Sequence, residues 1–167
     1  MKICIVWVGK TNESFFIQCI DNYVNRIKHY FPLEIIEIPD VKNAKNLDIN
    51  ELRKKEGELI LKSIKNDDYV ILLDDKGKQY SSVEFSKKID AYNLSSKKRI
   101  VFVIGGAFGF SQDVYKVANE FLSLSKMTFS HQMIRIILVE QIYRALTIIK
   151  GEPYHHEDSL FPNNKLK

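Results

Sequence analysis

Apolar residues in this chain occur in two patterns that alternate from one end to the other. Short continuous apolar runs predict buried strands, whereas stretches with apolar residues three and four positions apart predict helices. The predicted strands are Ile3–Val8, Leu33–Ile38, Tyr69–Leu73, Ile100–Ile104 and, on a weaker pattern, Phe121–Leu124. Asp74–Gly77 has the composition of a turn and is expected to end the third strand.

Helices are predicted between these strands by spacing and by capping signals. Asp48 with Glu51, and Ser81 with Glu84, have the spacing of a capping box, which marks a helix start. Other helical stretches cover Phe16–Ile27, Asp113–Glu120 and Ser130–Lys150. The last of these is apolar on almost every side, so we expect the sheet and a partner subunit to cover it. Strands that alternate with helices indicate one α/β domain with a mostly parallel sheet.

Length and composition agree with a single folded domain. The chain has 167 residues, of which 45% are hydrophobic and 28% charged, and it contains only 7 glycines and 4 prolines. This excludes a disordered or low-complexity chain. Cys4 and Cys19 give no disulfide framework, which fits a reducing cytoplasm. The apolar run after Lys2 is too short for a signal peptide or a membrane span, so we expect a cytoplasmic protein without membrane insertion.

The formal net charge of +4 permits a polyanionic partner but does not require one. Lysines and arginines are scattered in short groups, which is typical of a solvated surface. The sequence contains no ribonucleoprotein aromatic motif, no KH-type glycine clamp and no zinc-finger spacing. Any contact with a nucleic acid would therefore come from the α/β domain itself.

Three predicted strand ends are candidates for a binding site. They are Leu73–Asp74, Gly105–Phe110 and Leu124–Phe129. In an open parallel sheet, ligands bind in the crevice beyond the carboxyl ends of the strands. The glycines after the fourth strand allow a backbone to approach a ligand, although a tight turn explains them equally well. Their spacing is not the dinucleotide fingerprint, and neither a triphosphate-binding loop nor a Gly-x-Ser-x-Gly elbow is present.

The densest group of titratable residues lies near the C-terminus, at Tyr154–Asp158. Adjacent histidines rarely bind one ion, and no second histidine or cysteine motif supplements them, so no metal site is expected. Composition and position alone favour a polar chain end. The residue patterns thus indicate a cytoplasmic, oligomeric α/β domain with a ligand crevice.

Taken together, several segments resemble one family in order and spacing, and the resemblance runs from Met1 to about Glu157. The family is that of the ribosomal RNA large subunit methyltransferase H proteins. The segments are IEIPD (36–40), KNLDINELRKKEGE (45–58), LLDDKGK (72–78), VIGGAFGFS (103–111), SLSKMTFSHQMIR (123–135), IYRA (142–145) and PYHHE (153–157).

The resemblance implies a single SPOUT-type α/β methyltransferase domain over residues 1–157, followed by a C-terminal tail at 158–167. The family fold is a mostly parallel sheet flanked by helices, with a C-terminal trefoil knot, and it forms homodimers. Because threaded chains are rare, the knot is implied by the resemblance alone. The implied activity is methylation of N3 of a pseudouridine in a hairpin loop of 23S ribosomal RNA. The methyl donor is S-adenosylmethionine, the substrate is the assembled ribosome, and no metal is needed.

The resemblance also implies roles for individual residues. The cofactor-binding positions are Leu73, Gly105, Leu124, Ser125, Lys126, Met127, Thr128 and Phe129. The catalytic positions are Tyr154, His155 and His156. His155 is expected to accept or orient the proton of the target nitrogen, and Tyr154 to stack on the base or hydrogen-bond to it. His156 stands where arginine or lysine is usual, which weakens the case for a phosphate contact there.

Two arginines of the last predicted helix, Arg135 and Arg144, lie roughly on one face and are expected to stabilise the dimer, with an approach to the substrate as the alternative. Two alternative functions remain open on the sequence. One is a SPOUT methyltransferase that acts on transfer RNA, and the other is a non-catalytic α/β dimer that binds a nucleotide-like ligand.

Overall fold

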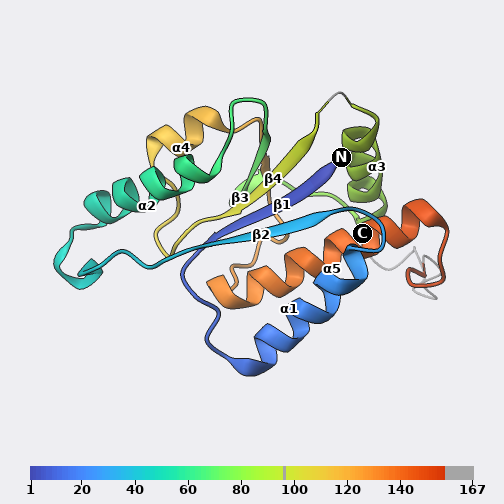
Figure 1. Cartoon of the computed structure of the whole chain (residues 1–167), viewed down its shortest axis with the longest axis horizontal. Helices are drawn as coiled ribbons and strands as arrows, with labels where there is room; N and C mark the ends of the chain where they lie inside the picture. The colour runs from blue at the N-terminus through green and yellow to red at the C-terminus, as the bar shows by residue number, and fades with distance from the viewer. Residues whose placement is uncertain (96, 157–167) are drawn as a thin grey trace, which may run out of the picture.

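The computed structural model describes residues 1–95 and 97–156, and the predicted tail at 158–167 lies outside the described residues. The strands form one parallel sheet in the order β2-β1-β4-β3-β5 (Figure 1). They are β1 (Lys2–Val8), β2 (Leu33–Ile38), β3 (Tyr69–Lys78), β4 (Arg99–Ile104) and β5 (Glu120–Leu122). The helices are α1 (Ser14–Ile27), α2 (Ile49–Ser63), α3 (Ser82–Leu94), α4 (Gln112–Val117) and α5 (His131–Lys150), with a 3-10 turn η1 (Ala44–Asn46). The predicted α/β class and parallel sheet are confirmed.

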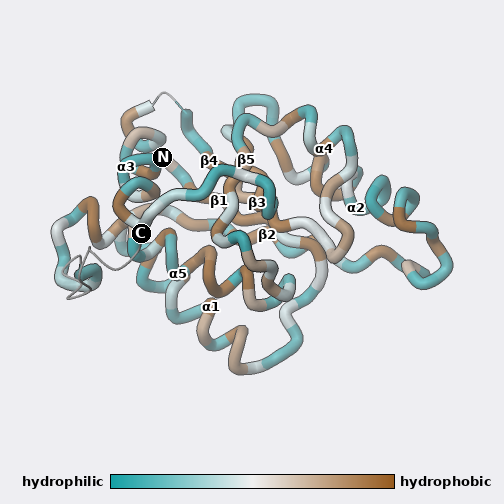
Figure 2. Tube along the Cα trace, turned by 180° about the vertical axis from the view of Figure 1, so that it is seen from behind, coloured by the Kyte–Doolittle hydropathy of each residue, from teal (hydrophilic) through white to brown (hydrophobic). Residues whose placement is uncertain are grey.

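The central strands are buried on both faces, which explains their continuous apolar sequences. Along β1, Ile3 and Ile5 point into the cluster that contains α1, α3 and α5, and Cys4 and Val6 point into the cluster with α2 and α4. This is the two-residue period of a strand with a hydrophobic layer on each side. Figure 1 shows the same division of helices between the two faces, and Figure 2 shows hydrophobic residues along the strands, α1 and α5.

The capping signals are confirmed at both predicted positions. Asp48 accepts hydrogen bonds from the backbone of Asn50 and Glu51, and Ser81 accepts one from Glu84. In each case the glutamate side chain bonds back to the cap residue. The first residues of α2 and α3 are therefore fixed by local chemistry.

The structure corrects two element boundaries. The predicted turn at Asp74–Gly77 is part of β3, because the strand bulges there and Leu73 and Lys78 both pair with Leu122. A side-chain carbon at Gly77 would lie 2.7 Å from the Leu122 backbone, so glycine permits this close pairing. The fourth helix ends at Val117 instead of continuing to Glu120, which begins β5.

Arg135 does not lie on a dimer surface, and this prediction was wrong. Its side chain is completely buried inside the chain. The guanidinium donates hydrogen bonds to the Val8 carbonyl at 2.7 Å and the Thr11 hydroxyl at 2.6 Å, and it lies over the Trp7 ring at 5.1 Å. Arg135 therefore ties the start of α5 to the end of β1.

Both α1 and α5 begin at the carboxyl edge of the sheet and end at the opposite edge. Near their starts, the Asn12 backbone N–H donates to the Gln132 side chain. Near their ends, the Tyr23 and Tyr143 rings are 5.9 Å apart. In the described part of the chain, no helix has both the length and the apolar content needed to cross a bilayer.

Candidate active site

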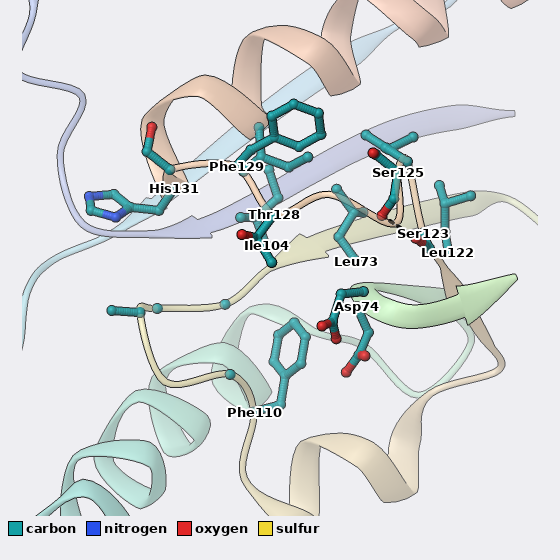
Figure 3. A pocket seen from close by; sticks show the side chains of 18 of the residues that line it. Leu73, Asp74, Ile104, Phe110, Leu122, Ser123, Ser125, Thr128, Phe129 and His131 are labelled. Carbon is teal, nitrogen blue, oxygen red and sulfur yellow. Dashed lines mark hydrogen bonds between the residues drawn. The ribbon is translucent and has the colours of Figure 1, made fainter. Parts of the chain in front are cut away.

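A cavity of about 430 Å³ opens at the carboxyl ends of β3, β4 and β5 (Figure 3). Its walls come from the strand ends at 73–75 and 104–107, from the loop at 122–131 and from the first turn of α5. Its volume is in the usual range for small-molecule sites. The three strand ends that sequence reasoning marked separately thus form one pocket, as expected for an open parallel sheet.

The loop that follows β4, Gly105–Phe110, is shaped by its glycines and is named here the glycine-rich loop. A side-chain carbon on Gly105 would lie 3.0 Å from the Phe110 ring, so a larger residue would displace that wall of the pocket. Gly109 has a φ of +79°, a conformation that glycine adopts without strain, and its N–H donates to the Gly106 carbonyl at 3.2 Å. The loop is thereby folded into a tight turn.

Serine hydroxyls order the third wall, residues 123–130. The Ser123 hydroxyl donates to the Ser125 carbonyl at 2.9 Å, and the Ser125 hydroxyl accepts a bond of 2.9 Å from the Met127 N–H. Ser130 then caps α5 by accepting from the Met133 N–H. These local bonds explain how a loop without regular structure keeps one shape.

Asp74 gives the pocket a negative charge. Burial works against ionisation of its carboxyl, but bonds from the Lys76 N–H at 2.9 Å and the Tyr115 hydroxyl at 2.7 Å outweigh burial and lower the pKa of Asp74. Desolvation, followed by the bond to this carboxylate, raises the pKa of the Tyr115 hydroxyl to about 12. With Asp75 also in the wall, the pocket suits a ligand that carries positive charge.

Most of the predicted cofactor positions line the cavity, and one does not. Leu73, Gly105, Leu124, Ser125, Met127, Thr128 and Phe129 are in its walls. Lys126 is exposed and is not among the wall residues. Phe110, the last residue of the candidate strand end Gly105–Phe110, also lines the pocket. Sequence reasoning gave no site role to His131 or Ile134, which line it as well. The position of His131 at the start of a helix that follows a predicted loop was the available signal.

The predicted catalytic residues lie at the other end of α5 from this cavity. That helix has 20 residues and spans about 30 Å, and Tyr154, His155 and His156 follow its C-terminal end (Figure 1). The Tyr154 hydroxyl donates to Glu140 at 3.2 Å and lies 3.3 Å from the Tyr23 hydroxyl. Burial, with the Tyr23 bond next, raises the pKa of Tyr154. Within one chain, the structure does not bring these residues to the pocket.

Arg144 packs on this C-terminal group. Its guanidinium lies over the Tyr154 ring at 4.8 Å, and one nitrogen is 3.4 Å from Nδ1 of His155. The same guanidinium bonds to Glu140, one turn earlier on α5. Tyr154 and His155 are half-buried, whereas His156 is exposed. The group is therefore a packed terminus with a defined geometry up to His155.

The comparisons with known proteins agree with this fold. A family model described as predicted SPOUT methyltransferase matches residues 1–155. The chain belongs to the SPOUT methyltransferase family. A probable methylase family protein from Haemophilus influenzae Rd KW20 has a similar fold, with a TM-score of 0.51 and 14% sequence identity over 95% of this chain and 72% of that one. The trefoil knot stays a prediction that family membership supports.

Relatives of this SPOUT methyltransferase cover almost its whole length. A protein from Parabacteroides distasonis named ribosomal RNA large subunit methyltransferase H is 54% identical over 157 residues, which is 94% of this chain and 100% of the relative. A protein of the same name from Christiangramia forsetii is 52% identical over 156 residues, 93% of this chain and 99% of the relative.

The pocket of this SPOUT methyltransferase fits a methyl donor of the sulfonium type. Leu73, Ile104 and Leu124 form apolar walls, and the glycines allow the backbone to approach a ligand closely. Asp74 and Asp75 add negative charge. Among residues 1–95 and 97–156, no group of three or more histidines, cysteines or acidic residues is placed to hold a metal ion.

Proposed function

We propose that this protein transfers a methyl group from S-adenosylmethionine to N3 of a pseudouridine in a hairpin loop of 23S ribosomal RNA, with the assembled ribosome as substrate. The observation that carries the proposal is the acidic, glycine-lined pocket formed by three strand ends in a SPOUT methyltransferase. The shared name of the relatives supports ribosomal RNA as the class of substrate.

Methyl transfer requires the protein to align the donor with the acceptor nitrogen and to provide for one proton transfer. S-adenosylmethionine supplies an activated methyl group when it is bound. Leu73, Gly105 and the loop at 124–129 would hold it in the pocket, and the acids of β3 would favour its positive charge. N3 of pseudouridine carries a proton at neutral pH, so a base must accept that proton or a donor network must stabilise the anion.

We propose that His155 accepts the proton of N3 and that Tyr154 contacts the target base. An imidazole has its ordinary pKa near neutrality, which suits a general base, and a tyrosine ring stacks on a base without sequence preference. His156 is exposed beside them, and because it stands where arginine or lysine is usual, a phosphate contact there has less support than the roles of Tyr154 and His155. These roles require the C-terminal group to reach a pocket.

A second copy of the chain would bring the C-terminal group to the pocket. The pocket and this group lie at opposite ends of α5, so two copies packed antiparallel would place each terminus at the other copy's pocket. Large apolar side chains are exposed near the starts of α1 and α5 and on the pocket loop: Phe15, Ile17, Met127, Phe129 and Met133. Such a set is typical of an interface, and it supports the homodimer.

The test is methyl transfer with labelled S-adenosylmethionine, offered to intact ribosomes and, separately, to transfer RNA. We expect label in the large-subunit RNA of ribosomes and none in transfer RNA. Label in transfer RNA instead would favour the other SPOUT substrate. Donor binding without any transfer would favour the non-catalytic α/β dimer.

Removal of the C-terminal group separates binding from transfer. A chain cut after Pro153 keeps all residues of the pocket, so we expect donor affinity within about threefold of the full chain and loss of transfer by at least about 100-fold. Affinity is measured by calorimetry and transfer by label incorporation. A chain cut after Glu157, which retains Tyr154–His156, is the matched control and should transfer normally. Full activity of the shorter chain would contradict the roles assigned to Tyr154 and His155.

A further inference from the structure

One face of α2 forms the support for the glycine-rich loop. Arg53, Glu56, Gly57 and Ile60 recur at the spacing of one helix face. Arg53 Nε donates to the Phe108 carbonyl at 2.6 Å, which holds the outer part of the loop. A side-chain carbon at Gly57 would lie 2.2 Å from the Ser111 hydroxyl, so the helix and the loop are in close contact there.

Glu56 lies directly behind this loop. A side-chain carbon on Gly106 would be 2.5 Å from Oε2 of Glu56 and 2.7 Å from Oε1. Gly106 lines the pocket, whereas Glu56 does not, so the loop backbone separates the carboxyl group from the cavity. The Glu56 side chain therefore faces the pocket through a residue without a side chain.

The Glu56 carboxyl group is buried and lacks the partners that such a group normally has. Glu56 is 8% exposed, and in the described residues its Oε2 has no hydrogen-bond partner. No ion pair joins it to a lysine, arginine or histidine in that part of the chain. Buried carboxyl groups are normally paired, because an unpaired one destabilises the fold. The unpaired carboxyl group of Glu56 therefore points to a role when a ligand is bound.

The charged groups near Glu56 do not balance a negative charge on its carboxyl group. Burial, followed by the nearby acid Asp40, raises the pKa of Glu56. The guanidinium of Arg53 is bound to the loop carbonyl, and Arg135 bonds to Val8 and Thr11. A positive charge in the pocket would relieve this imbalance, because charges interact strongly where water is excluded.

We propose that Glu56 is a positioning residue that acts through the glycine-rich loop to favour a sulfonium methyl donor over its neutral thioether product. The inference rests on the proposed function. When the methyl group leaves with its bond to the acceptor nitrogen formed, the electron pair of the broken carbon–sulfur bond stays on sulfur and the sulfonium loses its charge. A negative group behind Gly106 therefore stabilises the donor complex more than the product complex.

The test compares the affinities of S-adenosylmethionine and S-adenosylhomocysteine by calorimetry in the full chain and in Glu56→Gln. The amide keeps the shape and removes the charge. We expect the donor to bind about tenfold more weakly and the product to change by less than about threefold. Glu58→Gln removes an exposed acid from the same helix and should change neither affinity. Glu56→Asp keeps the charge and should keep the donor preference.

The possible outcomes separate this inference from the function on which it rests. If the unmodified chain binds neither ligand, the proposed function is wrong and the inference falls with it. If the unmodified chain binds the donor but Glu56→Gln weakens the binding of both ligands equally, or of neither, Glu56 does not discriminate by charge. In that case only the inference is overturned. Thermal midpoints of all variants show whether each protein is folded during the measurement.

Discussion

At the scale of single residues, the most informative comparison is between two buried charged side chains, Glu56 and Arg135. Two guanidinium nitrogens of Arg135 donate to the Val8 carbonyl and the Thr11 hydroxyl, and its Nε alone has no partner in the described residues. These two bonds give its burial a structural explanation. Glu56 has no such partners in the described residues, so its burial favours a functional explanation. The contrast shows that burial of a charge becomes informative only when its hydrogen bonds are known.

The buried carboxyl of Glu56 should make stability depend on pH. Its pKa is raised in the folded state, so between the ordinary and the raised value the folded chain holds a proton that the unfolded chain has released. Stability therefore falls as pH rises through this window. Glu56→Gln should match the unmodified protein below about pH 4.5 and exceed it by roughly 1 kcal/mol, or about 3 °C in midpoint, near pH 7. Thermal melts across pH measure this difference, with Glu58→Gln as the exposed control.

Replacement of Arg135 should be severely destabilising. Arg135→Met keeps an unbranched side chain but leaves the Val8 carbonyl and the Thr11 hydroxyl without their donor. We expect a loss of about 3 kcal/mol in the free energy of unfolding, measured by urea denaturation. Arg144→Met, at a half-buried position of the same helix, is the comparison and should lose less than about 1 kcal/mol. Equal losses would mean that the buried bonds contribute little.

At the scale of elements, hydrophobic periodicity predicted the strands, because each central strand needs apolar residues on both faces. It did not predict the β3 bulge, since Asp74–Gly77 has the composition of a turn and only the pairing with Leu122 shows that the strand continues. It also did not predict that α2 supports the glycine-rich loop. Glu56 follows polar neighbours and precedes a glycine, and local sequence does not show which polar residue of a helix faces a loop 50 residues away.

Gly57 tests the contact between α2 and the loop region. Alanine is ordinarily better than glycine inside a helix by about 1 kcal/mol. Here its side chain would collide with the Ser111 hydroxyl at 2.2 Å and approach Val114 at 3.3 Å. We expect Gly57→Ala to lower stability by about 1–2 kcal/mol in chemical denaturation. Ser111→Ala in the same chain should recover part of this loss, whereas a stabilised single variant would show that the contact is loose.

For the whole molecule, the pocket and the predicted catalytic group lie at opposite ends of α5. The sequence already places the loop at 124–129 before the predicted helix and Tyr154–His156 after it, but the pattern lacks the position of each helix end relative to the sheet. The fold supplies this, since α5 starts at the carboxyl edge where the pocket opens. A site made by one chain is thereby excluded for the described conformation, and the proposed enzyme needs two copies.

Subunit complementation tests this arrangement directly. One variant is the chain cut after Pro153, and the other is Thr128→Trp, which fills the cavity from an exposed position of its loop. Each alone should be inactive, because the first lacks the C-terminal group and the second lacks room for the donor. In an equal mixture refolded together, about one quarter of all sites should combine an open pocket with an intact terminus, and transfer should return to roughly that fraction. If each pocket used the terminus of its own chain, every site in the mixture would contain one defect and no activity would return. Measuring label incorporation before and after subunit exchange therefore distinguishes a shared site from a single-chain site.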